Sequence, residues 1–378
     1  MSETTSDAPA GLTREGCEER QRALREHLRR RGLATALIAD RRHVYYLTGY
    51  WCRAVFAAAA LVESDGPTTL VVPLPPEDEP AAGDVRVYES NRLGTLVDDQ
   101  PGAALRALAD RLGRFRRVGC DGPVCPWLVP ECEGIGDALL ALRRRKMADE
   151  VALLRRAIAA TEAAYRHASA ALAEGVTEVE LFAGMQAAAA ADAGEVLGEF
   201  GNDFQIGATG SPPRRRPARA GEVAILDLSV TLRGYRSDMC RSFVVGGSPT
   251  DEQLEAHRRV LEVLRYVEET ARPGVGCRRL YEEARAMLDG YRGWSFPHHL
   301  GHGTGLSAHE APRLNPHWDD TLRPGDVFTA EPGLYGPELR AGLRVEEIYL
   351  VTESGPLRLT SFPTGLARPD GPEGAAAG

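Results

Sequence analysis

The chain has 378 residues, 43% of them hydrophobic, which is enough for two domains with a sizeable core each. Its formal net charge of −9 argues against a nucleic-acid partner, because proteins that bind nucleic acids present basic surfaces. No apolar run reaches membrane-spanning length, and the seven cysteines lack CxxC spacing, which indicates reduced thiols. We therefore expect a cytoplasmic protein with no membrane partner.

The first third of the chain alternates helix and strand patterns, which is typical of an α/β unit. After a flexible polar tail at 1–12, we expect a smaller N-terminal domain over residues 13–143. Its expected elements are a helix at 13–31 that Gly32 ends, strands at 34–39 and 43–47, a hairpin of 57–62 with 68–72, a helix near 103–113 and a strand near 118–120. This part carries no catalytic constellation.

The second domain is expected over residues 144–366, followed by a flexible tail at 367–378. The basic run at 143–146 indicates a solvated linker at its start. A long amphipathic helix follows at 151–172, and capping-box patterns at Thr177 and Thr250 open two more helices. Because helices come in pairs bracketed by strand-like segments, the pattern predicts an α+β domain with antiparallel strands rather than a nucleotide-binding βαβ array.

Two aspartates lie on the predicted strand pair at 223–228 and 240–245. Asp227 and Asp238 are eleven residues apart, with Gly234 at the expected turn, so the hairpin can bring both carboxylates to one face. Alone, this pattern favours a hairpin with two solvated aspartates. A buried acid pair would instead need a shared proton or a bound cation.

Three downstream segments favour a buried acid pair that binds a cation. The segment FPHHLGHGTGLSAHE at 296–310 holds four histidines among glycines, Glu331 ends an apolar strand before a turn, and Glu346 lies in GLRVEE at 342–347. Four carboxylates and one imidazole suit Mn²⁺, Co²⁺, Fe²⁺ or Zn²⁺ better than a thiolate zinc site. Four negative charges would overload one divalent ion, so we expect two ions, which together can polarise a carbonyl.

This ordered set of motifs resembles the creatinase/prolidase/aminopeptidase P/methionine aminopeptidase superfamily, whose catalytic domain has the pita-bread fold. The segment HVYYLTGYW at 43–51 resembles the N-terminal domain of its two-domain members. The resemblance implies an α+β chain in which a smaller α/β creatinase/prolidase-like domain precedes a pita-bread catalytic domain. It also implies a homodimer.

The resemblance further implies a metal-ligand set. Carried onto this sequence, Asp227 binds one ion, Asp238 and Glu346 bridge both ions, and His302 and Glu331 bind the other. Manganese is the metal expected first, with Co²⁺, Zn²⁺ and Fe²⁺ as alternatives.

Catalytic roles are implied in the same way. Glu331 would act as general base or proton shuttle, and His309 would support the tetrahedral intermediate. His298 matches a further site histidine, and Arg344 matches the arginine that orients the bridging glutamate or contacts the substrate.

The sequence departs from the family pattern in three places. A histidine that peptidases of the superfamily usually carry would fall near Gly210, and His299 stands where glycine is common. Glu347 stands where aspartate is usual. The altered loop also carries three arginines at 214–216, which indicate a solvated basic loop or, as an alternative, a site for an acidic substrate group.

The expected function is metal-dependent hydrolysis of an amide C–N bond, with an Xaa-Pro dipeptide or short peptide as substrate. The missing loop histidine leaves open a non-peptide amide or amidine, as in creatinase-like or ectoine-hydrolase-like relatives. A third reading is an inactive pita-bread binding module, which would predict eroded ligands. Metal content and turnover of these substrate classes would distinguish the three.

Overall fold

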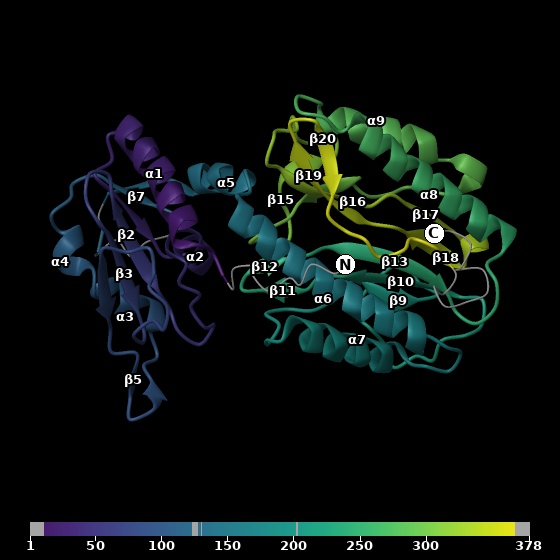
Figure 1. The fold of residues 1–378 in the computed structure, drawn as a ribbon, viewed down its shortest axis with the longest axis horizontal. Coiled ribbons are helices and arrows are strands. Elements are labelled where there is room, and N and C mark those ends of the chain that lie inside the picture. The colour runs from purple at the N-terminus through teal and green to yellow at the C-terminus, as the bar shows by residue number, and fades with distance from the viewer. Residues whose placement is uncertain (1–10, 123–127, 130, 202, 367–378) are drawn as a thin grey trace, which may run out of the picture. The chain divides into compact units, whose positions relative to one another are not determined.

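A computed structural model describes residues 11–122, 128–129, 131–201 and 203–366. The chain divides into two compact units, Met1–Arg143 and Arg144–Gly378 (Figure 1). The tails expected at 1–12 and 367–378 lie outside the described residues, apart from residues 11 and 12. Among the helices described, none combines the length and the apolar character needed to cross a membrane.

The first unit is built on a six-stranded sheet with the strand order β4-β3-β2-β1-β7-β8. β1 pairs antiparallel with β2 and parallel with β7, so the sheet is mixed. The strands are β1 (Thr35–Ile38), β2 (Ala59–Glu63), β3 (Thr68–Val72), β4 (Asp84–Val87), β5 (Asn91–Arg92), β6 (Thr95–Leu96), β7 (Val118–Cys120) and β8 (Cys132–Gly134). The helices are α1 (Arg14–Arg31), α2 (Arg41–Thr48), α3 (Gln100–Arg106), α4 (Ala109–Leu112) and α5 (Gly136–Arg144).

Two predictions for this unit are wrong. Residues 43–47 form part of helix α2 rather than a strand, because the Asp40 side chain caps it by accepting from the Arg42 N–H and Gly49 ends it at φ 74°. The single helix expected near 103–113 is two helices, α3 and α4. Where they separate, the Ala107 carbonyl accepts a hydrogen bond from the Arg86 guanidinium at 2.9 Å.

The second unit places helices on both sides of its strands, with α6 and α7 on one side and α8 and α9 on the other (Figure 1). Its sheets are antiparallel, with the orders β15-β14-β16-β19-β20 and β13-β10-β9. The helices are α6 (Ala148–Ala171), α7 (Glu178–Ala193), α8 (Asp251–Thr270) and α9 (Cys277–Leu288), with 3-10 turns at Tyr291–Gly293 and Pro337–Leu339. The strands are β9 (Phe204–Ile206), β10 (Val223–Leu228), β11 (Thr231–Leu232), β12 (Tyr235–Arg236), β13 (Met239–Val244), β14 (Gly301–Gly303), β15 (Glu310–Leu314), β16 (Val327–Ala330), β17 (Gly333–Gly336), β18 (Ala341–Arg344), β19 (Glu347–Thr352) and β20 (Gly355–Arg358).

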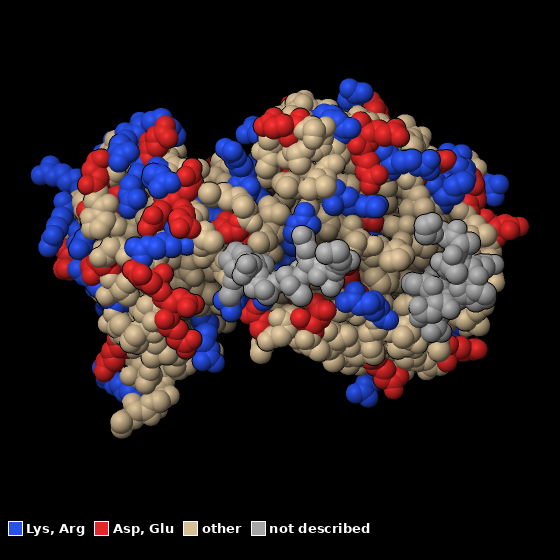
Figure 2. Space-filling view, viewed as in Figure 1, with Lys and Arg blue, Asp and Glu red and all other residues tan. Residues whose placement is uncertain are grey.

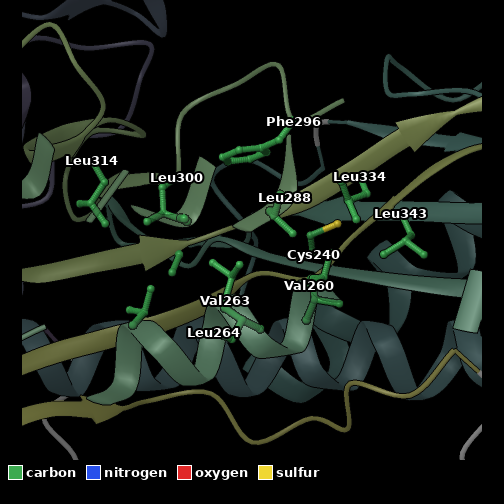
Figure 3. Packing of buried hydrophobic residues seen from close by; sticks show 14 of the residues in the cluster. Cys240, Val260, Val263, Leu264, Leu288, Phe296, Leu300, Leu314, Leu334 and Leu343 are labelled. Carbon is green, nitrogen blue, oxygen red and sulfur yellow. The ribbon is translucent and has the colours of Figure 1, made fainter. Parts of the chain in front are cut away.

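This architecture confirms the predicted α+β class. Both expected capping boxes form, with Thr177 at the start of α7 and Thr250 at the start of α8. The apolar stripe of α8 packs against the strands, and Figure 3 shows Val260 and Val263 beside Cys240 of β13. This packing of the apolar face of α8 stabilises the strands that carry the candidate site.

The basic run at 143–146 is not a solvated linker, contrary to the prediction. Arg144 and Lys146 are 8% and 6% exposed. Arg144 makes a bidentate ion pair with Asp326, and Lys146 Nζ lies 2.8 Å from Glu310 Oε2. These pairs fix the start of the second unit to its sheet.

The charged side chains of the described residues do not gather into large patches of one sign on the face shown in Figure 2. Basic and acidic side chains are interspersed there. Ion pairs also form within single helices, such as Arg30 with Glu26 in α1 and Arg279 with Glu283 in α9. Exposed pairs of this kind contribute little to stability, because water and salt screen them.

Candidate metal centre

Both aspartates of the β10–β13 pair reach one buried site. Asp227 of β10 lies opposite Cys240 in the antiparallel register, so Asp238, two residues before Cys240, falls on the same face. Gly234 lies between β11 and β12 with φ 83°, as the predicted turn requires. Asp227 and Asp238 are 9% and 8% exposed, so the solvated-hairpin reading is wrong.

His302 is held in strand β14 by glycine on both sides. A Cβ at Gly301 would lie 1.9 Å from the Thr329 carbonyl oxygen, and one at Gly303 would lie 2.3 Å from that of Ala311. The His302 Nδ1–H donates to the Gly303 carbonyl at 3.0 Å, which leaves the lone pair on Nε2. Nε2 lies 3.6 Å from Asp238 Oδ2 and 3.6 Å from Glu331 Oε1.

The two candidate glutamates each come shortly after a strand, and a backbone hydrogen bond fixes each of them. Glu331 comes directly after β16, and its N–H donates to the Leu300 carbonyl at 2.8 Å. Glu346 lies between β18 and β19, and its N–H donates to the Cys240 carbonyl at 3.0 Å. Glu346 is 1% exposed, and within the described residues its Oε2 has no hydrogen-bond partner.

A cavity of about 590 Å³ collects the candidate residues. Every site residue named from the sequence lines it: Asp227, Asp238, His298, His302, His309, Glu331, Arg344 and Glu346. The sequence reasoning missed Asp203 and Tyr335, which also line it. Tyr335 enters through the pairing of β17 with β18, which carries Arg344, and nothing local in the sequence indicates that pairing.

The carboxylates have too little positive charge around them. Burial raises the pKa of Asp227 to about 7, although the Arg344 charge opposes this. Burial and the neighbouring carboxylates raise the pKa of Asp238 and of Glu346 well above their usual range. Burial also acts to raise the pKa of Glu331, but the hydrogen bond with His299 and the charges of His299, His302 and Arg344 together outweigh it and bring that pKa to about 2.

Arg344 is the buried cation beside these acids. Its Nη2 lies 2.6 Å from Asp227 Oδ2, and its Nη1 donates to the Tyr335 hydroxyl at 3.3 Å. The Tyr335 hydroxyl lies 2.9 Å from His298 Nε2, and His298 Nδ1 donates to the His299 carbonyl at 2.8 Å. Both ring nitrogens of His298 are thus engaged within the protein, and His298 holds Tyr335 and Arg344 in place.

His309 has a more open position. It is exposed, and its ring stacks on that of His302 with centroids 3.7 Å apart and 15° between the planes. Although the side chain reaches solvent, partial desolvation by the surrounding cavity residues and the charge of His299 lower its pKa, which favours the neutral imidazole at neutral pH.

The altered loop contributes backbone rather than an imidazole. Gly210 lines the cavity with φ +137°, and a Cβ there would lie 3.0 Å from the Asp203 carboxylate carbon. Restoring a histidine at this position would therefore strain the loop. Arg214 pairs with Glu178 at 2.6 Å and Arg216 pairs with Glu222, and 39% and 29% of these two side chains stay exposed. Both arginines thus have a carboxylate partner within the chain, and the substrate-binding reading stays a prediction.

The donor set fits divalent metal ions. Two groups of ligand atoms lie within 4.8 Å of one another: Asp238, His302 and Glu346 in one, and His299, His302 and Glu331 in the other. The unpartnered Oε2 of Glu346 and the bare Nε2 of His302 are groups that a bound cation would satisfy. Asp227 belongs to neither group, because Arg344 holds its carboxylate.

Comparisons with known proteins agree with both halves of the chain. The sequence profile of metallopeptidase family M24 matches residues 152–353, and that of the creatinase/prolidase N-terminal domain matches residues 20–131. An Xaa-Pro dipeptidase of Pyrococcus furiosus is 33% identical over 237 residues, which cover 61% of this chain and 67% of that protein. One of Pyrococcus horikoshii is 40% identical over 141 residues, which cover 37% of this chain and 40% of that protein.

A solved structure extends the likeness to the whole fold. The prolidase from Pyrococcus horikoshii OT3 superposes with a TM-score of 0.77 at 24% sequence identity. The match covers 92% of this chain and 99% of that one. Together these findings confirm the resemblance and the pita-bread architecture that it implied.

Proposed function

The chain belongs to metallopeptidase family M24, and we propose that it uses two divalent metal ions to hydrolyse the amide bond before proline in Xaa-Pro dipeptides. The observation that carries the metal dependence is Glu346, which is buried with an unpartnered carboxylate oxygen among raised-pKa acids. The substrate class is supported by two relatives that are named Xaa-Pro dipeptidases.

Five residues would hold the ions: Asp227, Asp238, His302, Glu331 and Glu346. Their oxygen-rich set suits Mn²⁺, with Co²⁺, Zn²⁺ and Fe²⁺ as alternatives. When bound, such ions polarise a carbonyl and lower the pKa of water toward neutrality. Binding would require Asp227 to exchange its contact with Arg344 for a metal ion.

The other cavity residues have roles that follow from their contacts. Glu331 lines the cavity beside His299 and His302 and would serve as general base or proton shuttle. His309 presents a neutral ring to the cavity and can donate one N–H to a developing oxyanion. Arg344, freed from Asp227, would orient Glu346 or contact the substrate, and His298 would act by positioning Tyr335 and Arg344.

One observation favours a second candidate, the hydrolysis of a non-peptide amide or amidine. The loop that usually supplies a histidine has Gly210 in a backbone conformation that disfavours side chains. The binding-module reading is opposed by the ligand set, since all five residues line one cavity.

Assembly and location are further parts of the proposal. We propose a homodimer on the strength of the family resemblance, and sedimentation velocity tests it. A cytoplasmic location is supported by Cys17, Cys52, Cys120, Cys132, Cys240 and Cys277, which are free thiols in the described part of the chain.

The test is a substrate screen with the Mn²⁺-reconstituted protein. It compares Xaa-Pro dipeptides, matched Xaa-Ala dipeptides, and small N-acyl and amidino acids. We expect turnover of Xaa-Pro dipeptides at least about tenfold faster than of Xaa-Ala, a difference of about 1.4 kcal/mol in transition-state binding. Turnover of non-peptide amides alone would establish the second candidate instead.

A further inference from the structure

His299 lies against the candidate ligands although the expected set does not include it. We propose that His299 is a sixth metal ligand, which binds the same ion as His302 and Glu331 and biases that ion toward Zn²⁺ or Co²⁺ over Mn²⁺. This inference rests on the proposed function, because it assumes that the site holds metal.

The first argument is distance. His299 Nε2 lies 2.7 Å from Glu331 Oε1, and the ligand atoms of His299, His302 and Glu331 all lie within 4.8 Å of one another. Two ligand atoms that are each about 2.1 Å from one ion lie about 3–3.5 Å apart in octahedral or tetrahedral geometry. The separation of 3.6 Å between His302 Nε2 and Glu331 Oε1 is close to this range. The 2.7 Å between His299 Nε2 and Glu331 Oε1 is that of a hydrogen bond, so a shared ion would replace this bond and move the two atoms apart by less than about 1 Å.

The second argument is orientation. The rings of His299 and His302 have centroids 5.4 Å apart with 87° between their planes, so they approach Glu331 from different directions. His302 has only Nε2 free, because its Nδ1–H donates to the Gly303 carbonyl. Two imidazole nitrogens and a carboxylate thus converge at one point, which is a common arrangement for a transition-metal site.

Hydrogen bonds to the backbone fix the position of His299 and of its neighbour Leu300. The neighbouring Leu300 is fully buried in the core (Figure 3), its N–H donates to the Leu314 carbonyl, and its carbonyl accepts from the Glu331 N–H. The His299 carbonyl accepts from His298. These bonds hold His299 beside Glu331 at the edge of the cavity.

The chemical consequence is a change in metal preference. Oxygen ligands suit Mn²⁺, whereas imidazole favours Zn²⁺, Co²⁺ and Fe²⁺. Glycine is common at this position in the superfamily that the sequence resembles, so the second imidazole distinguishes this chain. One ion would then have two nitrogen ligands while the other keeps an oxygen-rich set.

The competing explanation is that His299 only donates a hydrogen bond to Glu331. His299→Gly and His299→Gln separate the two, because glutamine keeps an N–H donor but is a poor ligand. Zn²⁺ and Mn²⁺ affinities are measured by titration calorimetry in the full-length protein, with the distant surface variant His317→Gln as control. We expect both variants to lose at least about tenfold in Zn²⁺ affinity and less than about threefold in Mn²⁺ affinity.

Pulsed EPR of the protein loaded with one equivalent of Cu²⁺ then counts bound imidazoles without using activity. We expect two in the unsubstituted protein and one in either His299 variant. The inference would be overturned if His299→Gln bound Zn²⁺ as tightly as the unsubstituted protein does. It would also be overturned if only one imidazole bound Cu²⁺ in the unsubstituted protein. Failure of the unsubstituted protein to bind any of these ions would instead overturn the proposed function.

Discussion

Glu346, a buried carboxylate with an oxygen that has no hydrogen-bond partner among the described residues, is the residue whose substitution tests the metal site most directly. We expect Glu346→Gln to weaken Mn²⁺ binding at least about tenfold, because it removes one negative ligand. In the metal-free protein the same change should raise the melting temperature, because a carboxyl group whose pKa is raised by folding lowers the stability of the folded chain at neutral pH. Calorimetric titration and thermal unfolding measure both effects. The exposed Glu338→Gln is the control, and equal metal affinity in the two variants would contradict the assignment.

Tyr335 tests a positioning role. Its hydroxyl joins His298 to Arg344, so Tyr335→Phe leaves two buried polar groups without this partner. We expect kcat to fall about tenfold with bound metal unchanged, and stability to fall by about 1–3 kcal/mol. Tyr349→Phe is the matched control, because that hydroxyl bonds Glu268 outside the cavity. A loss of metal in Tyr335→Phe would show that the residue acts on the ligands instead.

The site residues differ in how far the sequence could predict them. Asp227 and Glu331 lie in or directly after apolar strands, but the spacing of Asp227 and Asp238 alone favours solvated aspartates. Only the ordered set of downstream motifs predicts a buried site. Tyr335 and Asp203 belong to none of these motifs, since their place in the cavity comes from pairings and loop paths between distant segments. The contact of Arg344 with Asp227 also spans distant strands, and no spacing rule gives it.

At the scale of secondary-structure elements, Arg241 joins β13 to the strand after the site. It is fully buried, bonds both carboxylate oxygens of Glu347 at 3.0 Å, and donates to the Glu346 carbonyl at 2.7 Å. This pair explains why the buried far-face Glu347 is tolerated.

We expect Arg241→Met to lower the free energy of unfolding by about 3–5 kcal/mol, because it leaves Glu347 buried without its cation. Denaturant unfolding measures this. The double variant Arg241→Met/Glu347→Leu should recover part of the loss, as both charges are then absent. If the double variant is no more stable than the single one, the loss comes from the backbone contacts of Arg241 rather than from the ion pair.

The elements also show where sequence patterns are reliable. Helices α7 and α8 were predicted because their capping boxes lie within four residues of chain. The basic run does not reveal its buried ion pair in the sequence, because the partner of Arg144 lies 182 residues away. The sequence of helix α2 resembles a strand because its apolar run is short, although the Asp40 cap indicates a helix.

For the whole molecule, the raised acid pKa values couple metal binding to stability. The pKa of Asp227 is about 7 in the folded chain against an ordinary 3.8, so its contribution to stability is present below about pH 4 and lost as the pH rises through 7. His302, whose pKa burial lowers to about 4, is neutral throughout pH 6.5–8 and does not offset this loss.

We therefore expect chelator-treated protein to become less stable from pH 6.5 to pH 8. Saturating Mn²⁺ should raise the melting temperature by about 5–10 °C at pH 8 and by less at pH 6.5. Differential scanning calorimetry at the two pH values measures this. An Mn²⁺ effect that is larger at pH 6.5 would contradict the pKa assignment.

The most direct measurement is the number of ions bound per chain, found by elemental analysis after equilibration with Mn²⁺ and removal of free metal, beside Xaa-Pro hydrolysis by the same sample. A two-ion centre predicts two ions per chain in the unsubstituted protein, and a loss of both bound metal and hydrolysis in Asp238→Asn. A chain that binds no ion, or that hydrolyses the dipeptide equally well in the presence of chelator, would contradict it.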